Sequence, residues 1–244
     1  MISDRLIFLP PPATYRDAAA TVHLTTADGV RISAVHLVNP DAEFTILYSH
    51  GNAEDLGLIA PQLVRLRDWG FSILAYDYRG YGTSQGRPSE HGVYEDVDAA
   101  YAYLTSAQGV PADRIIAYGR SVGSGPAVDL AARRPLAGLV VESAFVTAFR
   151  VMTRVPLLPF DKFRNVDKIA RVSCPVLVMH GVEDDIVPLA HGRRLFTAAR
   201  EPKRFLWVDG VGHNDFTLLA ADRQAQALRQ FSALLHDIRA RRGQ

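Results

Sequence analysis

The stretch IIAYGRSVGSG, residues 115–125, constrains the fold of this chain more than any other. Its first residues form a short apolar run rich in β-branched side chains, which is typical of a buried strand. Small residues follow from Gly123 to Ala132 and predict a helix. Between the two the backbone must turn sharply at Ser121, and Gly119 and Gly123 prevent side chains from colliding across that turn. The pattern predicts a serine hydroxyl held clear of a sheet, at a helix N-terminus where N–H groups converge.

The rest of the chain must support this interpretation, because a motif as short as Gly-x-Ser-x-Gly also occurs in ordinary turns. From Phe44 onward, continuous apolar runs alternate with segments of helical spacing. The apolar runs lie at 44–48, 71–76, 115–118, 139–141, 176–179 and 205–208, and the helical segments at 56–66, 93–104, 123–132, 189–200 and 228–238. Strands buried on both faces and separated by helices predict an α/β fold with a mostly parallel central sheet and helices on both faces. Residues 21–39 alternate around Asp28-Gly29 and predict an antiparallel edge hairpin.

Composition limits the classes of protein to which the chain can belong. Its 244 residues are 48% hydrophobic, which favours one domain spanning residues 1–244. The 27 basic and 26 acidic residues nearly cancel, so nothing indicates a nucleic-acid partner. No apolar run approaches the ~20 residues of a membrane span, and the first residues lack a signal-peptide pattern. The only cysteine, Cys174, excludes an internal disulfide and fits a reducing compartment, so we expect a cytoplasmic protein.

One interval, residues 143–173, interrupts the alternation of strands and helices. It is longer than the usual connection between two such elements. It contains many apolar side chains but has only weak periodicity. A helix packed on the sheet would explain this composition. We favour a small cap or lid over the site that lines an acyl pocket.

Three residue types that suit acyl transfer follow separate predicted strands. Ligands bind outside the carboxyl ends of strands in parallel sheets, so the residues that follow each strand are candidates for a site. Ser121, Asp184 and His213 each occupy such a position, and this is the chain order of the α/β-hydrolase catalytic triad. An imidazole can accept the serine proton, and a carboxylate can orient the ring and stabilise the imidazolium. We therefore predict a nucleophile elbow with Ser121 as nucleophile, Asp184 as acid and His213 as base.

Other carboxylates compete for the role of the acid. Glu183 and Asp185 adjoin the favoured aspartate, and Glu142 ends an earlier strand, a position that some hydrolases use. Asp209 also follows a strand, but it is so close to the predicted base in sequence that bracing a turn is the better interpretation.

Two more histidines, His50 and His180, end strands and precede glycines. We expect them to pin loops by hydrogen bonds, because no local ligand spacing supports a metal site. Asp77 and Arg79 could form a substrate clamp, but we favour a structural ion pair that braces the loop 80–82.

The oxyanion of a tetrahedral intermediate needs two N–H donors. The amide of Val122, directly after the nucleophile, is the first candidate. The second should come from the loop after the first parallel strand, where Asn52 is the best choice. Asn52 also fits a helix cap, and both roles are compatible. This chemistry needs no metal or organic cofactor.

Several longer stretches carry a resemblance to one group of proteins. They are HGNAEDLG (50–57), YDYRGYGTSQGRPSE (76–90), YGRSVGSGPA (118–127), HGVEDDIVP (180–188) and GHND (212–215), and FLPPPATY (8–15) also fits. In these stretches the chain resembles the bud-emergence-type α/β-hydrolases, a branch that also holds membrane-associated protein depalmitoylases. The resemblance extends from about residue 5 to residue 240. It implies the α/β-hydrolase fold and a serine hydrolase with Ser121, Asp184 and His213 as its triad, the acid being set by the HGxxD pattern. The chain lacks the N-terminal cysteine cluster that is lipidated in the depalmitoylases.

Together these observations predict a serine esterase that hydrolyses a small-molecule acyl ester through an acyl-serine intermediate. A thioesterase, a depalmitoylase or a small peptidase would use the same triad. A non-catalytic protein with this fold, binding a ligand or another protein, is the alternative from a different class. The sequence does not indicate an oligomeric state.

Overall fold

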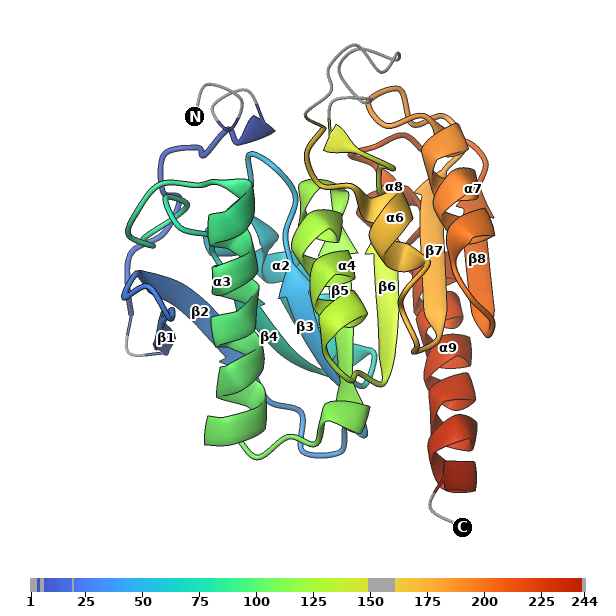
Figure 1. The fold of residues 1–244 in the computed structure, drawn as a ribbon, viewed down its shortest axis with the longest axis horizontal. Helices are drawn as coiled ribbons and strands as arrows, with labels where there is room; N and C mark the ends of the chain where they lie inside the picture. Colours follow the sequence, from blue (N-terminus) through green and yellow to red (C-terminus); the bar gives the residue numbers. More distant parts are fainter. Residues whose placement is uncertain (1–3, 5–6, 19, 149–160, 243–244) are drawn as a thin grey trace.

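An eight-stranded sheet forms the centre of the computed structural model, which describes Asp4 and residues 7–18, 20–148 and 161–242 (Figure 1). Its strands are β1 (Thr21–Thr25), β2 (Arg31–Leu37), β3 (Thr45–Ser49), β4 (Ser72–Tyr76), β5 (Ile115–Arg120), β6 (Gly138–Glu142), β7 (Val176–Gly181) and β8 (Lys203–Val208). They lie in the order β1-β2-β4-β3-β5-β6-β7-β8. The β1–β2 and β2–β4 pairs are antiparallel and the other pairs are parallel. The predicted α/β architecture, with a mostly parallel sheet and an antiparallel edge hairpin, is confirmed.

Helices cover both faces of this sheet. Figure 1 shows α3 (Glu90–Ala102), α4 (Ser124–Arg133), α6 (Asn165–Ile169) and α7 (Leu189–Ala198) in front of the strands, with α2 (Leu56–Asp68), α8 (Phe216–Leu219) and α9 (Ala221–Arg242) behind them. Short turns of helix lie at η1 (Tyr103–Ala107), η2 (Ala112–Arg114) and η3 (Ser121–Gly123). Each face has its own apolar core, the front one around Val97 and Leu130 and the back one around Leu63 and Phe231.

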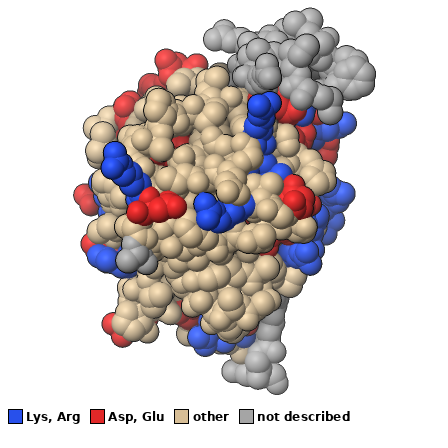
Figure 2. Space-filling model, turned by 90° about the vertical axis from the view of Figure 1, so that its left-hand side faces the viewer, with Lys and Arg blue, Asp and Glu red and all other residues tan. Residues whose placement is uncertain are grey.

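The inner strands explain the unbroken apolar runs of the sequence. Every residue of β3, β4, β5, β6 and β7 is buried, because helices pack on both of their faces. Side chains that point to either face therefore need to be apolar. The edge strand β8 is only partly buried, and Phe205 within it is exposed. Figure 2 looks at the opposite edge, where β1 lies, and shows acidic and basic side chains in a band across its middle with a largely uncharged area below.

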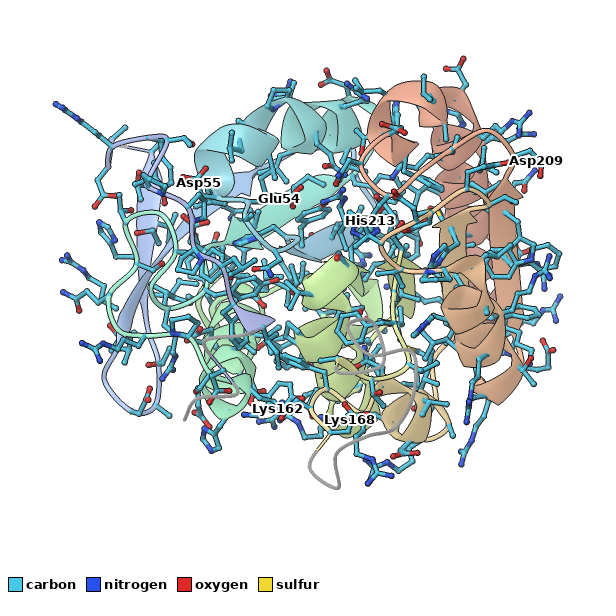
Figure 3. The ribbon with its side chains drawn as sticks, turned by 90° about the horizontal axis from the view of Figure 1, so that it is seen from above. Glu54, Asp55, Lys162, Lys168, Asp209 and His213 are labelled. Atoms are coloured by element: carbon cyan, nitrogen blue, oxygen red, sulfur yellow. The ribbon has the colours of Figure 1, made fainter. Side chains whose placement is uncertain are left out.

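Strand register brings the carboxyl ends of the parallel strands together at one edge. Ser49 of β3 pairs with Gly119 of β5, and Arg120 pairs with Glu142 of β6. The loops that leave these strands must therefore start side by side. Figure 3 looks down on this edge, and His213 lies near its middle.

The predicted cap is described only in part. Residues 143–148 and 161–173, including α6, belong to the described chain, and residues 149–160 lie outside the described residues. A lid formed by residues 143–173 therefore stays a prediction. None of the helices in the described part of the chain combines the length and the apolar character needed to cross a bilayer.

The turn between β5 and α4 is as tight as the glycine pattern predicts. Ser121 at its apex has a φ of 50°, in the left-handed region that side chains disfavour. A Cβ atom on Gly119 would lie 2.4 Å from the carbonyl oxygen of Gly123. A Cβ atom on Gly123 would lie 2.1 Å from the carbonyl oxygen of Ser49. Both neighbours are backbone atoms of buried elements, so neither can move aside easily.

We expect Gly123→Ala to lower the free energy of unfolding by at least about 2 kcal/mol, because its methyl group would overlap the β3 backbone. Urea denaturation followed by circular dichroism measures this change. Gly109→Asn is the control, because a Cβ atom on Gly109 would meet no other atom within 4 Å and the φ of 66° is one that asparagine tolerates. Equal stability of the two variants would contradict the steric argument.

Candidate active site

The structure brings together the serine, the histidine and the aspartate that the sequence singles out. Ser121 follows β5, Asp184 follows β7, and His213 lies in the loop after β8. The Nε2 atom of His213 is 3.0 Å from Ser121 Oγ. Its Nδ1 atom is 2.8 Å from Asp184 Oδ2. The three side chains therefore form one hydrogen-bonded chain in which a proton can pass from the hydroxyl to the ring.

Asp184 is held in its ionised form. Its Oδ1 atom accepts hydrogen bonds from the amides of Val187 at 2.7 Å and Ile186 at 3.1 Å. Burial opposes the charge, but hydrogen bonds from His180, His213 and the Val187 amide outweigh it and hold the pKa of Asp184 well below its usual range. A fixed negative charge at this point can stabilise an imidazolium on His213.

The competing carboxylates have other partners. Glu142 is fully buried and accepts hydrogen bonds from Tyr118 and from Gln224. Glu183 accepts the Val211 amide at 3.1 Å, and Asp185 is exposed to solvent. Asp209 lies at the edge of the molecule, well apart from His213 (Figure 3). The geometry thus favours the aspartate of the HGxxD pattern among the candidates.

The two predicted oxyanion donors lie in loops that follow adjacent strands. Val122 is in the first turn of η3, where amides have no acceptor within the helix. The side chain of Asn52 is occupied, because Nδ2 donates to the Ile7 carbonyl at 2.6 Å and Oδ1 accepts from the Leu9 amide at 2.9 Å. Its backbone amide is therefore the group that remains for an oxyanion. The alternative role of Asn52 as a helix cap is not the one observed, because Asp55 caps α2 by accepting the Leu58 amide at 3.0 Å.

Hydrogen bonds behind these donors fix the peptide groups to which they belong. The Nδ1 atom of His50 is 2.8 Å from the Gly51 carbonyl, and that carbonyl shares its peptide group with the Asn52 amide. Ser124 Oγ donates to the Ser121 carbonyl at 2.6 Å, and that carbonyl shares its peptide group with the Val122 amide. The hydrogen bonds from His50 and Ser124 therefore fix the orientation of the two peptide groups to which the predicted donors belong. His180 likewise contacts the Val187 carbonyl at 2.7 Å, so both histidines pin loops as predicted.

A cavity of about 610 Å³ opens in front of Ser121. This volume lies within the range of small-molecule sites. Apolar side chains form much of its wall, namely Ile7, Leu9, Val122, Phe145, Ala148, Ile186 and Val187. Its polar lining includes Asn52, Glu54, Arg120, His213 and Asn214. The described residues contain no group of three or more His, Cys, Asp or Glu side chains arranged to hold a metal ion.

The expected ion pair between Asp77 and Arg79 is wrong. Arg79 donates from Nε to Asp96 at 2.9 Å and from Nη1 to Asp28 at 2.7 Å. Asp77 accepts the Tyr15 hydroxyl at 2.5 Å and lies 3.3 Å from His50 Nε2. Both side chains brace neighbouring elements, but with different partners.

Sequence reasoning did not single out Arg120 and Glu54, which also line the cavity. Their side chains form an ion pair, and Arg120 directly precedes Ser121. One signal was available, because this position lies at the carboxyl end of a predicted strand. Arg120 is the only charged residue in the stretch 115–125.

Comparison with known proteins places these features in context. A family described as "Serine aminopeptidase, S33" matches residues 40–163. Alpha/beta hydrolase domain-containing protein 17B of Xenopus tropicalis is 36% identical and is aligned over 94% of this chain and 90% of its own. Its human counterpart is 35% identical over the same shares of the two chains. Among solved structures, the Pyrococcus furiosus esterase Pf2001 superposes with a TM-score of 0.79 at 17% identity, over 94% of this chain and 98% of its own. That structure supports the fold alone.

We expect the contribution of Asp184 to stability to disappear in acid. A carboxylate whose pKa is lower in the folded than in the unfolded chain stabilises the fold above the unfolded value of about 3.9, and this contribution is lost as the pH falls through the folded value. The free energy of unfolding of the wild type should exceed that of Asp184→Asn by on the order of 1–2 kcal/mol at pH 7, and the difference should shrink below about pH 4. Urea titrations at pH 7, 4 and 3 measure this difference in the free energy of unfolding. A difference that stays constant would contradict the lowered pKa of Asp184.

Proposed function

The chain belongs to the α/β-hydrolases, in the family described as serine aminopeptidase S33, and we propose that it is a serine hydrolase that cleaves carboxylic esters. The observation that carries this proposal is the hydrogen-bonded chain from Ser121 through His213 to Asp184, open to a cavity of about 610 Å³. The family alone supports a hydrolase. The geometry supports the serine as its nucleophile.

The proposed reaction has two halves, each with a proton transfer through His213. Ser121 Oγ attacks the ester carbonyl carbon while its proton moves to His213 Nε2. The tetrahedral oxyanion accepts hydrogen bonds from the amides of Val122 and Asn52. The intermediate collapses to an acyl-Ser121, and the leaving alcohol takes the proton from His213. Water then attacks the acyl group by the same route and releases the carboxylic acid and the free serine.

The substrate class follows from the cavity wall. Apolar side chains such as Leu9, Phe145 and Ile186 suit an uncharged acyl chain. Residues 143–148 contribute part of this wall, which supports the proposal that residues 143–173 act as a cap over the acyl pocket. The cytoplasmic location inferred from the single cysteine stays a prediction.

Two other classes of function are compatible with the same fold: cleavage of a different acyl bond, and binding without catalysis. A thioesterase, a depalmitoylase or a small peptidase would need the same three side chains, and the description of the matching family names an aminopeptidase. Rates on matched ester, thioester and amide substrates that share one acyl group separate these activities. A non-catalytic binding protein would show neither turnover nor labelling by a serine-directed probe.

We expect Ser121→Ala to lower kcat on p-nitrophenyl butyrate by at least about 10³-fold, because the variant lacks the attacking oxygen. Labelling by a fluorophosphonate probe should disappear with it. Ser106→Ala is the control, since Ser106 is an exposed serine outside the cavity. Unchanged turnover in Ser121→Ala would end the proposal.

We expect kcat/KM to fall in acid, because the reaction needs a general base that is free to accept the proton of Ser121. An imidazole that has taken a proton from solvent cannot accept the proton of Ser121. The measurement is kcat/KM from pH 5 to pH 9, with circular dichroism at each pH to verify folding. A profile with no decline on its acid side would contradict a general base in this reaction.

A further inference from the structure

The guanidinium of Arg120 connects the loops from which the site is built. Arg120 is the last residue of β5, directly before Ser121, and only 8% of its side chain is exposed. Its Nη2 atom donates to the His213 carbonyl at 3.1 Å and to Asn214 Oδ1 at 3.3 Å. Its Nη1 atom donates to the carboxylate of Glu54. One side chain thus reaches the loop of the base and the loop after β3.

The contact with Glu54 extends to the predicted oxyanion loop. Glu54 Oε2 accepts the Gly51 amide at 2.6 Å, so the carboxylate bridges Arg120 and the residue before Asn52. The guanidinium also needs the space that Gly51 leaves, because a Cβ atom there would lie 2.6 Å from Arg120 Nη1. Glu54 and His213 belong to separate loops over the same edge of the sheet (Figure 3).

Charge complementarity keeps this guanidinium ionised in a buried place. Burial opposes the charge, but the carboxylates of Glu54 and Glu142 outweigh it and raise the pKa of Arg120 above its usual value. Glu142 Oε1 lies 3.4 Å from Arg120 Nε. The planar guanidinium of arginine can donate hydrogen bonds to several acceptors in different directions at once. The compact ammonium of lysine cannot reach all of these acceptors.

We propose that Arg120 is a positioning residue that holds the His213 loop and the Gly51–Glu54 loop in register with Ser121. This proposal rests on the proposed function, because it assigns Arg120 to the same reaction. The backbone of His213 is fixed by the guanidinium on one side, and its ring is fixed by Asp184 on the other. A displacement of about 1 Å at such a site can cost about 100-fold in rate.

The test compares Arg120→Ala with Arg79→Ala on p-nitrophenyl butyrate. Arg79 is an arginine of equal exposure that also bridges two carboxylates, but it does not line the cavity. We expect Arg120→Ala to lower kcat per folded molecule by about 10- to 100-fold while KM changes by less than about threefold. Arg79→Ala should retain kcat within about threefold even if its stability falls. Arg120→Lys should lose about tenfold in kcat, and it decides the question alone if the alanine variant does not fold.

Chemical rescue gives a second readout, which should not respond if a residue has a merely structural role. Because Arg120 lines the cavity, a small cation can reach the space that Arg120→Ala leaves. We expect saturable recovery of kcat, by about fivefold or more, with ethylguanidinium and none with ethylammonium, which has the charge without the fork. Arg79→Ala should not respond to either cation.

Three results would overturn the positioning role. They are a kcat for Arg120→Ala equal to that of Arg79→Ala, a loss confined to KM, and equal rescue by both cations. Failure of the proposed function gives a different result, because Ser121→Ala would then keep the turnover of the wild type. Failure of the positioning role alone would leave Ser121→Ala inactive.

Discussion

The hydrogen bond between His213 Nε2 and Ser121 Oγ, 3.0 Å long, is the interaction on which the site depends. It joins residues 92 positions apart in the chain, so local structure alone cannot create it. The register of the parallel strands does so, because β5, β6, β7 and β8 pair in succession and end at one edge. Each loop then needs to cross only the width of a strand or two to reach its neighbour. The buried sheet is therefore the precondition of the proposed chemistry.

The serine must be presented at a strained point of the backbone, and the surrounding packing maintains that strain. Ser121 has a positive φ, which costs on the order of 1 kcal/mol or more for a residue with a side chain. The turn cannot relax, because β3 and α4 enclose it and the Ser124 hydroxyl and amide both bond the Ser121 carbonyl. Strain of this kind persists only where neighbouring structure overdetermines the conformation. It directs the hydroxyl away from the sheet and toward the ring of His213.

Features that depend on one segment at a time were predictable from the sequence, and features that depend on strand order were not. The apolar runs reveal β3 to β7 because burial on both faces demands continuous apolar side chains. The triad candidates follow from their places after strands. The pairing of Arg79 with Asp28 and Asp96 could not be predicted, because it depends on how the edge hairpin and α3 pack around the loop after β4. The position of Arg120 before Ser121 was a signal, but its pairing with Glu54 could not be predicted, because that pairing depends on β3 and β5 being neighbours.

A cation buried directly before Ser121 is hard to explain by stability alone. Removing a guanidinium from water costs several kcal/mol, and apolar residues that fill the same volume often stabilise a fold as well or better. Glu142 beside it is also fully buried, and burial raises its pKa, although the charge of Arg120 opposes that shift. These charges therefore contribute little net stability for their desolvation. What the arrangement provides is a fixed geometry, since one planar guanidinium contacts both the His213 carbonyl and the Glu54 carboxylate, which in turn accepts the Gly51 amide. Apolar contacts are non-directional, whereas a proton transfer requires the two atoms, here 3.0 Å apart, to stay within hydrogen-bond reach.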